Sequence, residues 1–198
     1  MVAGVTTCYK ARMRADPAYR KITVEEFLSI DFGSDRRFEL EDGVIVMMTG
    51  GTVAHAWVKG NIFAWLRAQL RGRPCRPFDS DVAIRISETE LRYPDVSIYC
   101  GEISLGDMRQ LKMINDPVSV IEVLSPSTTA LDQGTKLEEY RRIASIRTIA
   151  FVDPINEMCR TVERLEDGWL DHIFSGARGI PIPALDLVIP HDEIFARD

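Results

Sequence analysis

The order of hydrophobic and polar positions along the chain predicts a mixture of strands and helices. Alternation with a period of two indicates two strands, and two continuous apolar runs indicate two more that are buried on both faces. These four predicted strands cover residues 81–87, 92–100, 118–124 and 148–154. Apolar residues at helical spacing predict helices over 53–71, where Gly72 follows as a stop, and over roughly 131–145.

Two Asp-Gly dipeptides predict β-hairpins at either end of this arrangement. FELEDGVIVMM (38–48) contains Asp42-Gly43, the dipeptide that a tight turn prefers, and CRTVERLEDGWLDHIF turns at Asp167-Gly168. The two alternating strands are also expected to form a hairpin, because about five polar residues separate them. The resulting order is hairpin, helix, three strands, helix, strand and hairpin, which predicts a mixed α/β sheet with helices packed against it.

Composition narrows the class of protein. With 198 residues, 45% of them hydrophobic and 27% charged, the chain is long enough to bury a core and has an ordinary soluble composition. We predict a basic N-terminal arm over 1–21 and a single domain over 22–198. No apolar run approaches the roughly 20 residues that span a bilayer. The four cysteines are scattered, which favours reduced thiols and a cytoplasmic location.

The net charge of −6 counts against tight, non-specific binding to DNA, because polyanion-binding proteins usually carry the opposite balance. A local basic groove remains compatible with this charge. Its candidate residues are Arg67, Arg71, Arg73 and Arg76. The alternative for these four arginines is an ordinary solvated helix end.

One acidic residue lies in an otherwise apolar strand. In VSVIEVLSPST (118–128), Glu122 is surrounded by valine and isoleucine, and a carboxylate removed from water costs several kcal/mol unless it is paired. Asp95 follows Pro94 at the beginning of the preceding strand, so both carboxylates can converge at one end of the sheet. Such a pair needs a cation between its charges, and Mg²⁺ prefers carboxylate oxygens. Alternatively, Glu122 pairs with an arginine and Asp95 caps a turn.

A resemblance to a known family rests on three stretches of this sequence: YPDVSIYC, VIEVLSPSTTALDQGTKLEEY and IAFVDP. They resemble the Uma-two family of "putative restriction endonucleases", which belongs to the PD-(D/E)XK nuclease superfamily. The likeness runs from about Phe38 to Pro154. It implies a restriction endonuclease-like core of helix, three strands, helix and strand, with the β-hairpins added, in agreement with the order predicted above.

The resemblance also implies roles for individual residues. Asp95 and Glu122 correspond to the metal-binding acids of the superfamily, whose lysine should stand two residues after the second acid. This chain has Leu124 there, and leucine is unable to orient or help deprotonate an attacking water. The resemblance offers Lys136 as a displaced replacement. The alternative for Lys136 is a surface ion pair with Asp132, four residues earlier.

Four further residues are weaker candidates for the site. Glu39 would be an additional acid near the metal, since the predicted helix at 53–71 contains no Asp or Glu, although a solvent-facing strand position is its alternative. Asp81, at the beginning of its predicted strand, is similarly ambiguous. His55 would contact a substrate phosphate, or else be a helix-surface or satisfied core histidine. Tyr140 would pack beneath the site, with a direct role for its hydroxyl as the alternative.

The expected function is hydrolysis of DNA phosphodiester bonds by a Mg²⁺- or Mn²⁺-dependent endonuclease that forms a homodimer. Asp95 and Glu122 would bind the ion, water would attack in line, and Lys136 would assist. The alternative is a catalytically inactive protein of the same fold that serves in recognition or assembly, which Leu124 and the acidic balance favour. A hydrolase of another phosphate ester is a third hypothesis.

Overall fold

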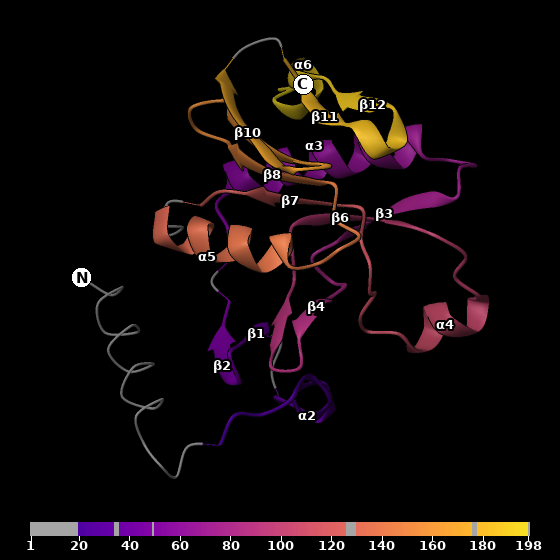
Figure 1. The fold of residues 1–198 in the computed structure, drawn as a ribbon, viewed down its shortest axis with the longest axis vertical. Coiled ribbons are helices and arrows are strands. Elements are labelled where there is room, and N and C mark those ends of the chain that lie inside the picture. Colours follow the sequence, from indigo (N-terminus) through magenta and orange to yellow (C-terminus); the bar gives the residue numbers. More distant parts are fainter. Residues whose placement is uncertain (1–19, 34–35, 49, 126–129, 176–177, 198) are drawn as a thin grey trace. The chain divides into compact units, whose positions relative to one another are not determined.

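The computed structural model describes residues 20–33, 36–48, 50–125, 130–175 and 178–197 (Figure 1). The chain divides into two compact units, a smaller one with residues 1–49 and 87–92 and a larger one with residues 50–86 and 93–198. Most of the predicted basic arm lies outside the described residues. The division into this arm and a single domain over 22–198 therefore stays a prediction.

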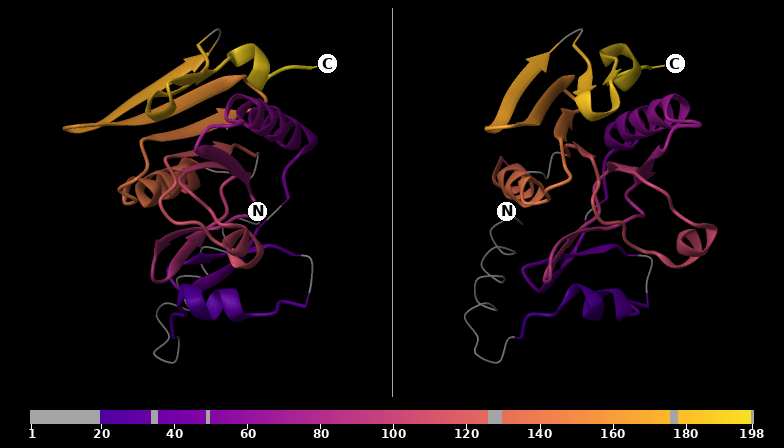
Figure 2. Two further views of the ribbon diagram at one scale, coloured as in Figure 1. Left: turned by 90° about the vertical axis from the view of Figure 1, so that its right-hand side faces the viewer. Right: turned by 45° about the vertical axis from the view of Figure 1, so that its right-hand side comes forward.

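A six-stranded sheet forms the centre of the larger unit (Figures 1 and 2). Its order is β10-β9-β8-β7-β6-β3, in which β7 and β8 are parallel and the other neighbours are antiparallel. The strands are β3 (Cys75–Asp79), β6 (Val96–Cys100), β7 (Ser119–Val123), β8 (Thr148–Asp153), β9 (Met158–Leu165) and β10 (Gly168–Ser175). Parallel neighbours require a crossover connection, and α5 (Ala130–Arg141) lies in the one between β7 and β8.

Helices cover both faces of this sheet, which explains the continuous apolar character of β7. Ile121 and Val123 belong to a hydrophobic cluster with α3 (Val53–Gln69), whereas Val120 belongs to a second cluster with residues of α5. Successive side chains of a strand point to opposite faces, so a strand covered on both sides is apolar at nearly every position. Glu122 shares its face with Val120 and therefore points toward α5.

The C-terminal segment packs on the α3 side of the larger unit. It contains β11 (Ile180–Ile182), the short 3₁₀ helix η1 (Pro183–Leu185), β12 (Leu187–Ile189) and α6 (His191–Ile194). The indole nitrogen of Trp57 on α3 donates to the backbone oxygen of Ala196, at 2.7 Å. The remaining helix, α4 (Leu105–Gln110), lies in the connection between β6 and β7. Within the described residues, no helix is both long and apolar enough to cross a membrane.

The smaller unit contains β1 (Phe38–Glu41), β2 (Val44–Met47) and β5 (Glu90–Arg92), and β1 pairs antiparallel with both other strands. The predicted turn at Asp42-Gly43 is confirmed, since both residues have the positive φ, 49° and 76°, that a two-residue hairpin requires. Helix α2 (Val24–Ser29) begins with a capping box between Thr23 and Glu26. Strand β4 (Ile84–Ser87) carries the chain from the larger unit into the smaller one.

The predicted strand 92–100 is wrong in its extent. The structure has two separate strands here, β5 and β6, with Tyr93 and Pro94 between them. Proline has no N–H to donate to a neighbouring strand, which interrupts the pairing at this point. Because the two strands are separate, Asp95 takes no part in regular strand pairing and lies directly before β6.

The predicted hairpin between 81–87 and 92–100 is confirmed where β4 neighbours β5, but it is not part of the central sheet. In the central sheet β6 lies between β7 and β3. Strand β3 pairs with it from Cys75 opposite Cys100 to Asp79 opposite Val96. The pattern did not reveal β3, because CRPFD contains a proline and two charged residues. Proline is tolerated there because β3 is an edge strand of the sheet.

The expectation of reduced cysteines is wrong for one pair. Cys75 and Cys100 lie opposite each other on β3 and β6, with Cα atoms 4.0 Å apart, and form a disulfide. Their separation of 25 residues gave no hint of this, because only the pairing of two strands brings them together. Cys159 is a free, buried thiol, and desolvation raises its pKa to about 12.

Arg164 of β9 connects the C-terminal end of α5 to the central sheet through hydrogen bonds. Its guanidinium donates to the backbone oxygens of Ile146 at 2.8 Å and of Arg141 and Ile143 at 2.9 Å. It also lies 4.2 Å from the centre of the Trp169 ring. Desolvation lowers the pKa of Arg164, so its contacts are made at some cost in hydration. One planar side chain thus satisfies the carbonyl group of the last residue of α5 and two carbonyl groups of the connection that follows it.

A thiol count of the C8S variant tests the disulfide. In denaturant without reductant, we expect one reactive thiol, from Cys159, and after reduction we expect three. In the folded protein Cys159 should react slowly, because its thiol is buried and its pKa lies far above neutral pH. Three thiols before reduction would show that Cys75 and Cys100 are reduced, as the sequence had predicted.

Removal of the Arg164 side chain should loosen α5. We expect R164A to lower the free energy of unfolding by about 2 kcal/mol, because buried carbonyl oxygens lose a charged donor. R164K should recover only part of this loss, since lysine lacks the planar fork. Urea denaturation measures both variants. R147A is the control, because Arg147 is exposed, and it should change stability by less than about 0.5 kcal/mol. Equal effects of R164A and R147A would contradict the assignment.

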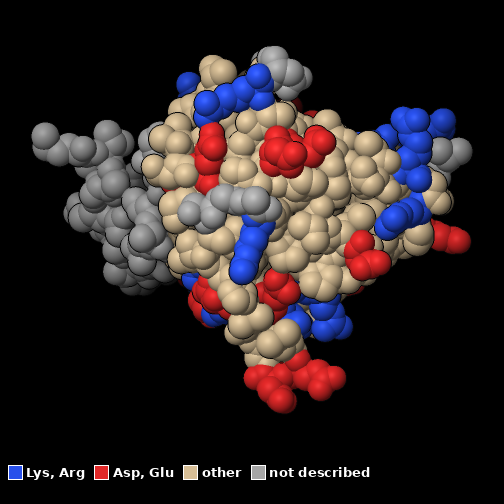
Figure 3. Space-filling model, turned by 90° about the horizontal axis from the view of Figure 1, so that it is seen from above, with Lys and Arg blue, Asp and Glu red and all other residues tan. Residues whose placement is uncertain are grey.

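The surface carries charges of both signs, spread among uncharged side chains, in the view of Figure 3. Lysine and arginine side chains gather at the right-hand edge of this view, on the side where Figure 1 draws β3. A net charge of −6 therefore does not mean a uniformly acidic surface.

Candidate active site

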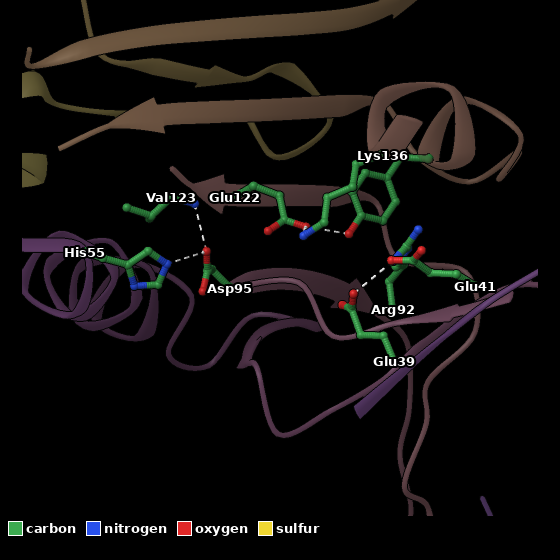
Figure 4. A network of polar contacts seen from close by, with 9 residues as sticks. Glu39, Glu41, His55, Arg92, Asp95, Glu122, Val123 and Lys136 are labelled. Carbon is green, nitrogen blue, oxygen red and sulfur yellow. Dashed lines mark hydrogen bonds and ion pairs between the residues drawn. The ribbon is translucent and has the colours of Figure 1, made fainter. Parts of the chain in front are cut away.

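Two acidic side chains meet where β6 begins and β7 ends. The antiparallel register pairs Val96 with Ile121, so one further step along both strands places Asp95 opposite Glu122. Opposite residues of an antiparallel pair lie close together on the same face. Figure 4 shows both carboxylates projecting into the same region, with α3 on one side and α5 on the other.

The carboxylate of Glu122 is buried and receives two strong donors. Its side chain is 7% exposed, and Oε1 accepts from Lys136 Nζ at 2.9 Å and from the Tyr140 hydroxyl at 2.6 Å. Both donors come from α5, where residues four apart lie on the same helix face. The ion pair and the charge-assisted hydrogen bond offset the cost of burying this carboxylate. The cation that the structure shows beside Glu122 is therefore a lysine and not the arginine of the alternative.

Lys136 reaches Glu122 from fourteen positions further along the chain. Its side chain is 23% exposed, so the ammonium group contacts the buried carboxylate while part of it remains accessible to water. Leu124, which stands where the resemblance leads one to expect a lysine, is instead packed against the hydrophobic cluster of α5. The side chain of Asp132, the alternative partner of Lys136, lies outside the described part of the structure.

Tyr140 packs in the core and also contacts Glu122, while a direct role for its hydroxyl stays a prediction. Its side chain is fully buried in the α5 cluster, as expected of a residue that packs beneath the site. Its hydroxyl also donates directly to Glu122. A charge-assisted bond of this kind holds the carboxylate in one orientation as well as stabilising it.

Asp95 is held in place by the backbone of the opposite strand. Its Oδ2 accepts from the N–H of Val123 at 2.8 Å, the residue directly after Glu122, and lies 3.1 Å from His55 Nε2. His55 lies in the first turn of α3, whose N-cap is Thr52. Both contacts use Oδ2, and within the described residues Oδ1 has no hydrogen-bond partner. The carboxylate is thus oriented but keeps one oxygen available.

His55 is therefore more than a helix-surface residue. Its side chain is 14% exposed, and the partner that the structure gives it is the Asp95 carboxylate. The histidine links the beginning of α3 to the first acid, whereas lysine and tyrosine link α5 to the second. Its predicted contact with a substrate phosphate stays a prediction.

Glu39 lies in the smaller unit, and its proposed role as a further acid near the metal stays a prediction. Its carboxylate accepts from Arg92 at 2.9 Å, and the same guanidinium donates to Glu41 at 2.7 Å (Figure 4). Glu39 is 7% exposed and Arg92 is 3% exposed, so the alternative of a solvent-facing position is wrong. The sequence pattern did not identify Arg92, because a charged residue in a short strand normally indicates a solvated face.

Asp81 does not begin a strand, contrary to expectation. It lies exposed in the turn between β3 and β4, where its backbone N–H donates to Asp79 Oδ1 at 3.1 Å. Strand β4 begins only at Ile84. The local bond is that of an Asx turn, which accounts for the acidic residues in this stretch.

The donor atoms at the Asp95–Glu122 pair suit a hard divalent cation. Magnesium is commonly held by one or two carboxylates and completes its coordination with water and phosphate oxygens. In the part of the chain that the structure describes, no three or more His, Cys, Asp and Glu residues gather as a metal-binding group. Two oxygen-donating acids and an available Oδ1 on Asp95 are compatible with an ion that retains several waters.

Comparisons with known proteins agree with one another. The family model described as "Uma2: Putative restriction endonuclease" matches residues 24–189. Two uncharacterized proteins of Synechocystis sp., slr1290 and sll1609, are each 27% identical to this chain. The first alignment covers 89% of this chain and 93% of the relative, and the second covers 73% and 80%.

A solved structure shares the fold. The crystal structure of a "putative nuclease belonging to DUF820" from Anabaena variabilis superposes with a TM-score of 0.70 and 17% sequence identity, over 88% of this chain and 98% of that one. At this identity, the likeness concerns the mixed α/β fold alone.

A double-mutant cycle tests the pair between Glu122 and Lys136. In EDTA at neutral pH, K136M should be the most destabilised of three variants, because it leaves a buried carboxylate without its cation. E122Q should cost less, since the partly exposed Lys136 can be hydrated. We expect the double variant E122Q/K136M to reveal a coupling of about 1–2 kcal/mol in urea denaturation. A coupling near zero would show that the contact contributes nothing to stability.

Proposed function

Because the chain belongs to the Uma2 family of "putative restriction endonucleases", we propose that it is a metal-dependent endonuclease that hydrolyses DNA phosphodiester bonds at the Asp95–Glu122 pair. The observation that carries this proposal is the position of Lys136. Its ammonium lies 2.9 Å from the second acid although position 124 is leucine. Helix α5 thus supplies from the crossover the cation that the superfamily takes from the strand itself.

The order of elements in the larger unit supports the proposal. Apart from β4, β5 and α4, which lie between them, helix α3, strands β3, β6 and β7, helix α5 and strand β8 occur in the order helix, three strands, helix and strand. This is the restriction endonuclease-like core that the resemblance to the PD-(D/E)XK superfamily implies. The carboxylate pair lies on two of its central strands, at the ends where both helices reach it.

Mg²⁺ or Mn²⁺ is the cofactor that we propose, and Asp95 and Glu122 are the residues that would hold it. A bound ion of this kind activates water and neutralises the charge that develops on a phosphate. Asp95 would offer its available Oδ1, while Val123 and His55 keep Oδ2 in place. His55 is in this scheme a positioning residue for the first acid.

Lys136 has the catalytic role that the resemblance assigns to the missing strand lysine. Its partly exposed ammonium would orient the attacking water and stabilise negative charge on the phosphate. Tyr140 would act through Glu122, by holding the carboxylate in one orientation. We further propose that the protein acts as a homodimer, because two sites related by twofold symmetry would allow both strands of a duplex to be cut in one encounter.

A catalytically inactive relative that serves in recognition or assembly is the second candidate function. One observation favours it, since Lys136 and Tyr140 already offset the buried charge of Glu122 through protein groups alone. An ion is then not needed to keep the carboxylate in the core.

Cleavage of supercoiled plasmid DNA tests the proposed activity. The wild-type protein should nick or linearise the plasmid with Mg²⁺ or Mn²⁺ and not in EDTA. D95N and E122Q should lose at least roughly a hundredfold in rate, because each removes a charged ligand of the ion. K136M should lose activity and K136R should recover part of it. E138Q, an exposed glutamate of the same helix, is the matched control and should cleave like wild type.

Thermal denaturation of the same variants separates the two functions. An ion that binds only the folded protein stabilises it by about 2.7 kcal/mol at a hundredfold excess over Kd. The melting temperature of the wild type and E138Q should therefore rise with Mg²⁺, while D95N and E122Q should not respond. A wild type that neither responds to metal nor cleaves DNA would overturn the proposal and select the inactive relative.

A further inference from the structure

The geometry points to a second phosphate-binding site, in a pocket at the C-terminal end of α3. This site would bind the DNA backbone at a distance from the bond that is cleaved. This inference rests on the proposed function. Four arginines line the pocket: Arg67, Arg71, Arg73 and Arg76. We call it the arginine pocket. Its volume of about 190 Å³ is several times that of a water molecule, roughly 30 Å³, and is sufficient for a phosphate group.

The chain builds this pocket where α3 turns back into the sheet. Arg67 lies in the last turn of the helix, and Arg71 lies one turn further on. Gly72 then has a positive φ of 79°, which reverses the chain and brings Arg73 and Arg76 to the same place. The disulfide between Cys75 and Cys100 ties this edge of the sheet to β6. The disulfide therefore holds the chain segment next to these arginines in a fixed position.

The charge of the pocket is not neutralised by neighbouring acids. The lining residues include no Asp or Glu, and among the described residues the side chains of Arg67, Arg71 and Arg76 form no ion pair. Arg73 donates only to the backbone oxygen of Leu185, at 3.3 Å. In a protein with six more acidic than basic residues, four such cations around one concavity create a local positive potential.

A solvated helix end does not account for this arrangement. The partial negative charge at the C-terminus of α3 favours a cation within the last turn, and Arg67 satisfies that preference. Arg73 and Arg76 lie beyond the helix, on the connection and on β3, where the helix charge has fallen off. Guanidinium groups bind phosphate through two parallel hydrogen bonds, so several of them around one pocket match a phosphate-bearing ligand.

The pocket and the Asp95–Glu122 pair lie at opposite ends of α3. His55 is in the first turn and Arg67 is in the last, twelve residues later, which corresponds to roughly 18 Å along the helix axis. Strand β6 runs the same way, from Asp95 near one end to Cys100 at the other. One DNA strand advances by about 3.4 Å per nucleotide along the duplex axis, so with a duplex parallel to α3 the pocket would contact the backbone about five nucleotides from the cleaved bond.

A matched pair of charge-removing variants tests this contact. R67Q/R71Q removes two pocket arginines, whereas R109Q/R147Q removes two exposed arginines elsewhere, one of them also in the last turn of a helix. Affinity for a fluorescein-labelled duplex is measured by anisotropy in EDTA over a range of salt concentrations. R67Q/R71Q should bind at least roughly tenfold more weakly and lose about one unit of salt slope, since one phosphate contact contributes about 0.9.

The control variant should change the affinity by less than about twofold and leave the salt slope unchanged. Equal losses in both double variants, no loss in R67Q/R71Q, or no binding of the duplex by the wild type would each overturn the inference. Thermal denaturation with inorganic phosphate identifies the source of the ligand. Stabilisation by phosphate that R67Q/R71Q abolishes, with duplex affinity unchanged, would assign the pocket to a small phosphate compound and would overturn the DNA contact.

Plasmid cleavage with Mg²⁺ keeps this result separate from the proposed activity. At saturating DNA, R67Q/R71Q should cleave at the wild-type rate, because the Asp95–Glu122 pair is intact, while the DNA concentration that it needs should rise. A wild type that cleaves, together with a pocket variant that binds normally, would refute the arginine pocket alone. If the wild-type protein shows no metal-dependent cleavage, the proposed endonuclease activity is refuted.

Discussion

The buried charge of Glu122 is the constraint on which the site depends. A buried carboxylate near the end of β7 is stable only if charged or polar groups are brought to it, and both donors that the structure shows come from α5. The helix must therefore lie on one face of β7 with Lys136 and Tyr140 pointing toward the strand. Arg164 secures this position by binding the carbonyl oxygens at the C-terminal end of α5.

The opposite helix has the corresponding role for the first acid. Asp95 is oriented by the N–H of Val123 and by His55 from the beginning of α3, so each face of the sheet contributes one helix to the carboxylate pair. Helix α3 also reaches the arginine pocket at its other end. Helix α3 thus has the carboxylate pair at one end and four arginines at the other. The negative net charge of the chain gives no indication of this separation.

Features that depend on neighbouring residues could be predicted from the sequence. The apolar run around Glu122, the helix with its stop at Gly72 and the turn at Asp42-Gly43 all appear where local pattern places them. The turn predicted at Asp167-Gly168 is shifted by one residue, because Gly168 already pairs with Leu165 and the turn is formed by Glu166 and Asp167. Pattern failed where the decisive contact is distant along the chain. Strand β3 is stable only as the edge neighbour of β6, and its disulfide follows from that pairing. The ion pairs of Arg92 likewise join strands that are far apart in sequence.

By itself, the sequence determined the alternation of elements, the family and the identity of the two acids, because periodicity and motif are properties of neighbouring residues. Only the tertiary structure decided which cation accompanies Glu122, that Asp95 contacts His55, and that four arginines share one pocket. The physical reason is the same in each case. A charged side chain interacts strongly with another group only when the two lie within a few ångströms of each other. Strand pairing and helix packing decide which residues fall within that distance.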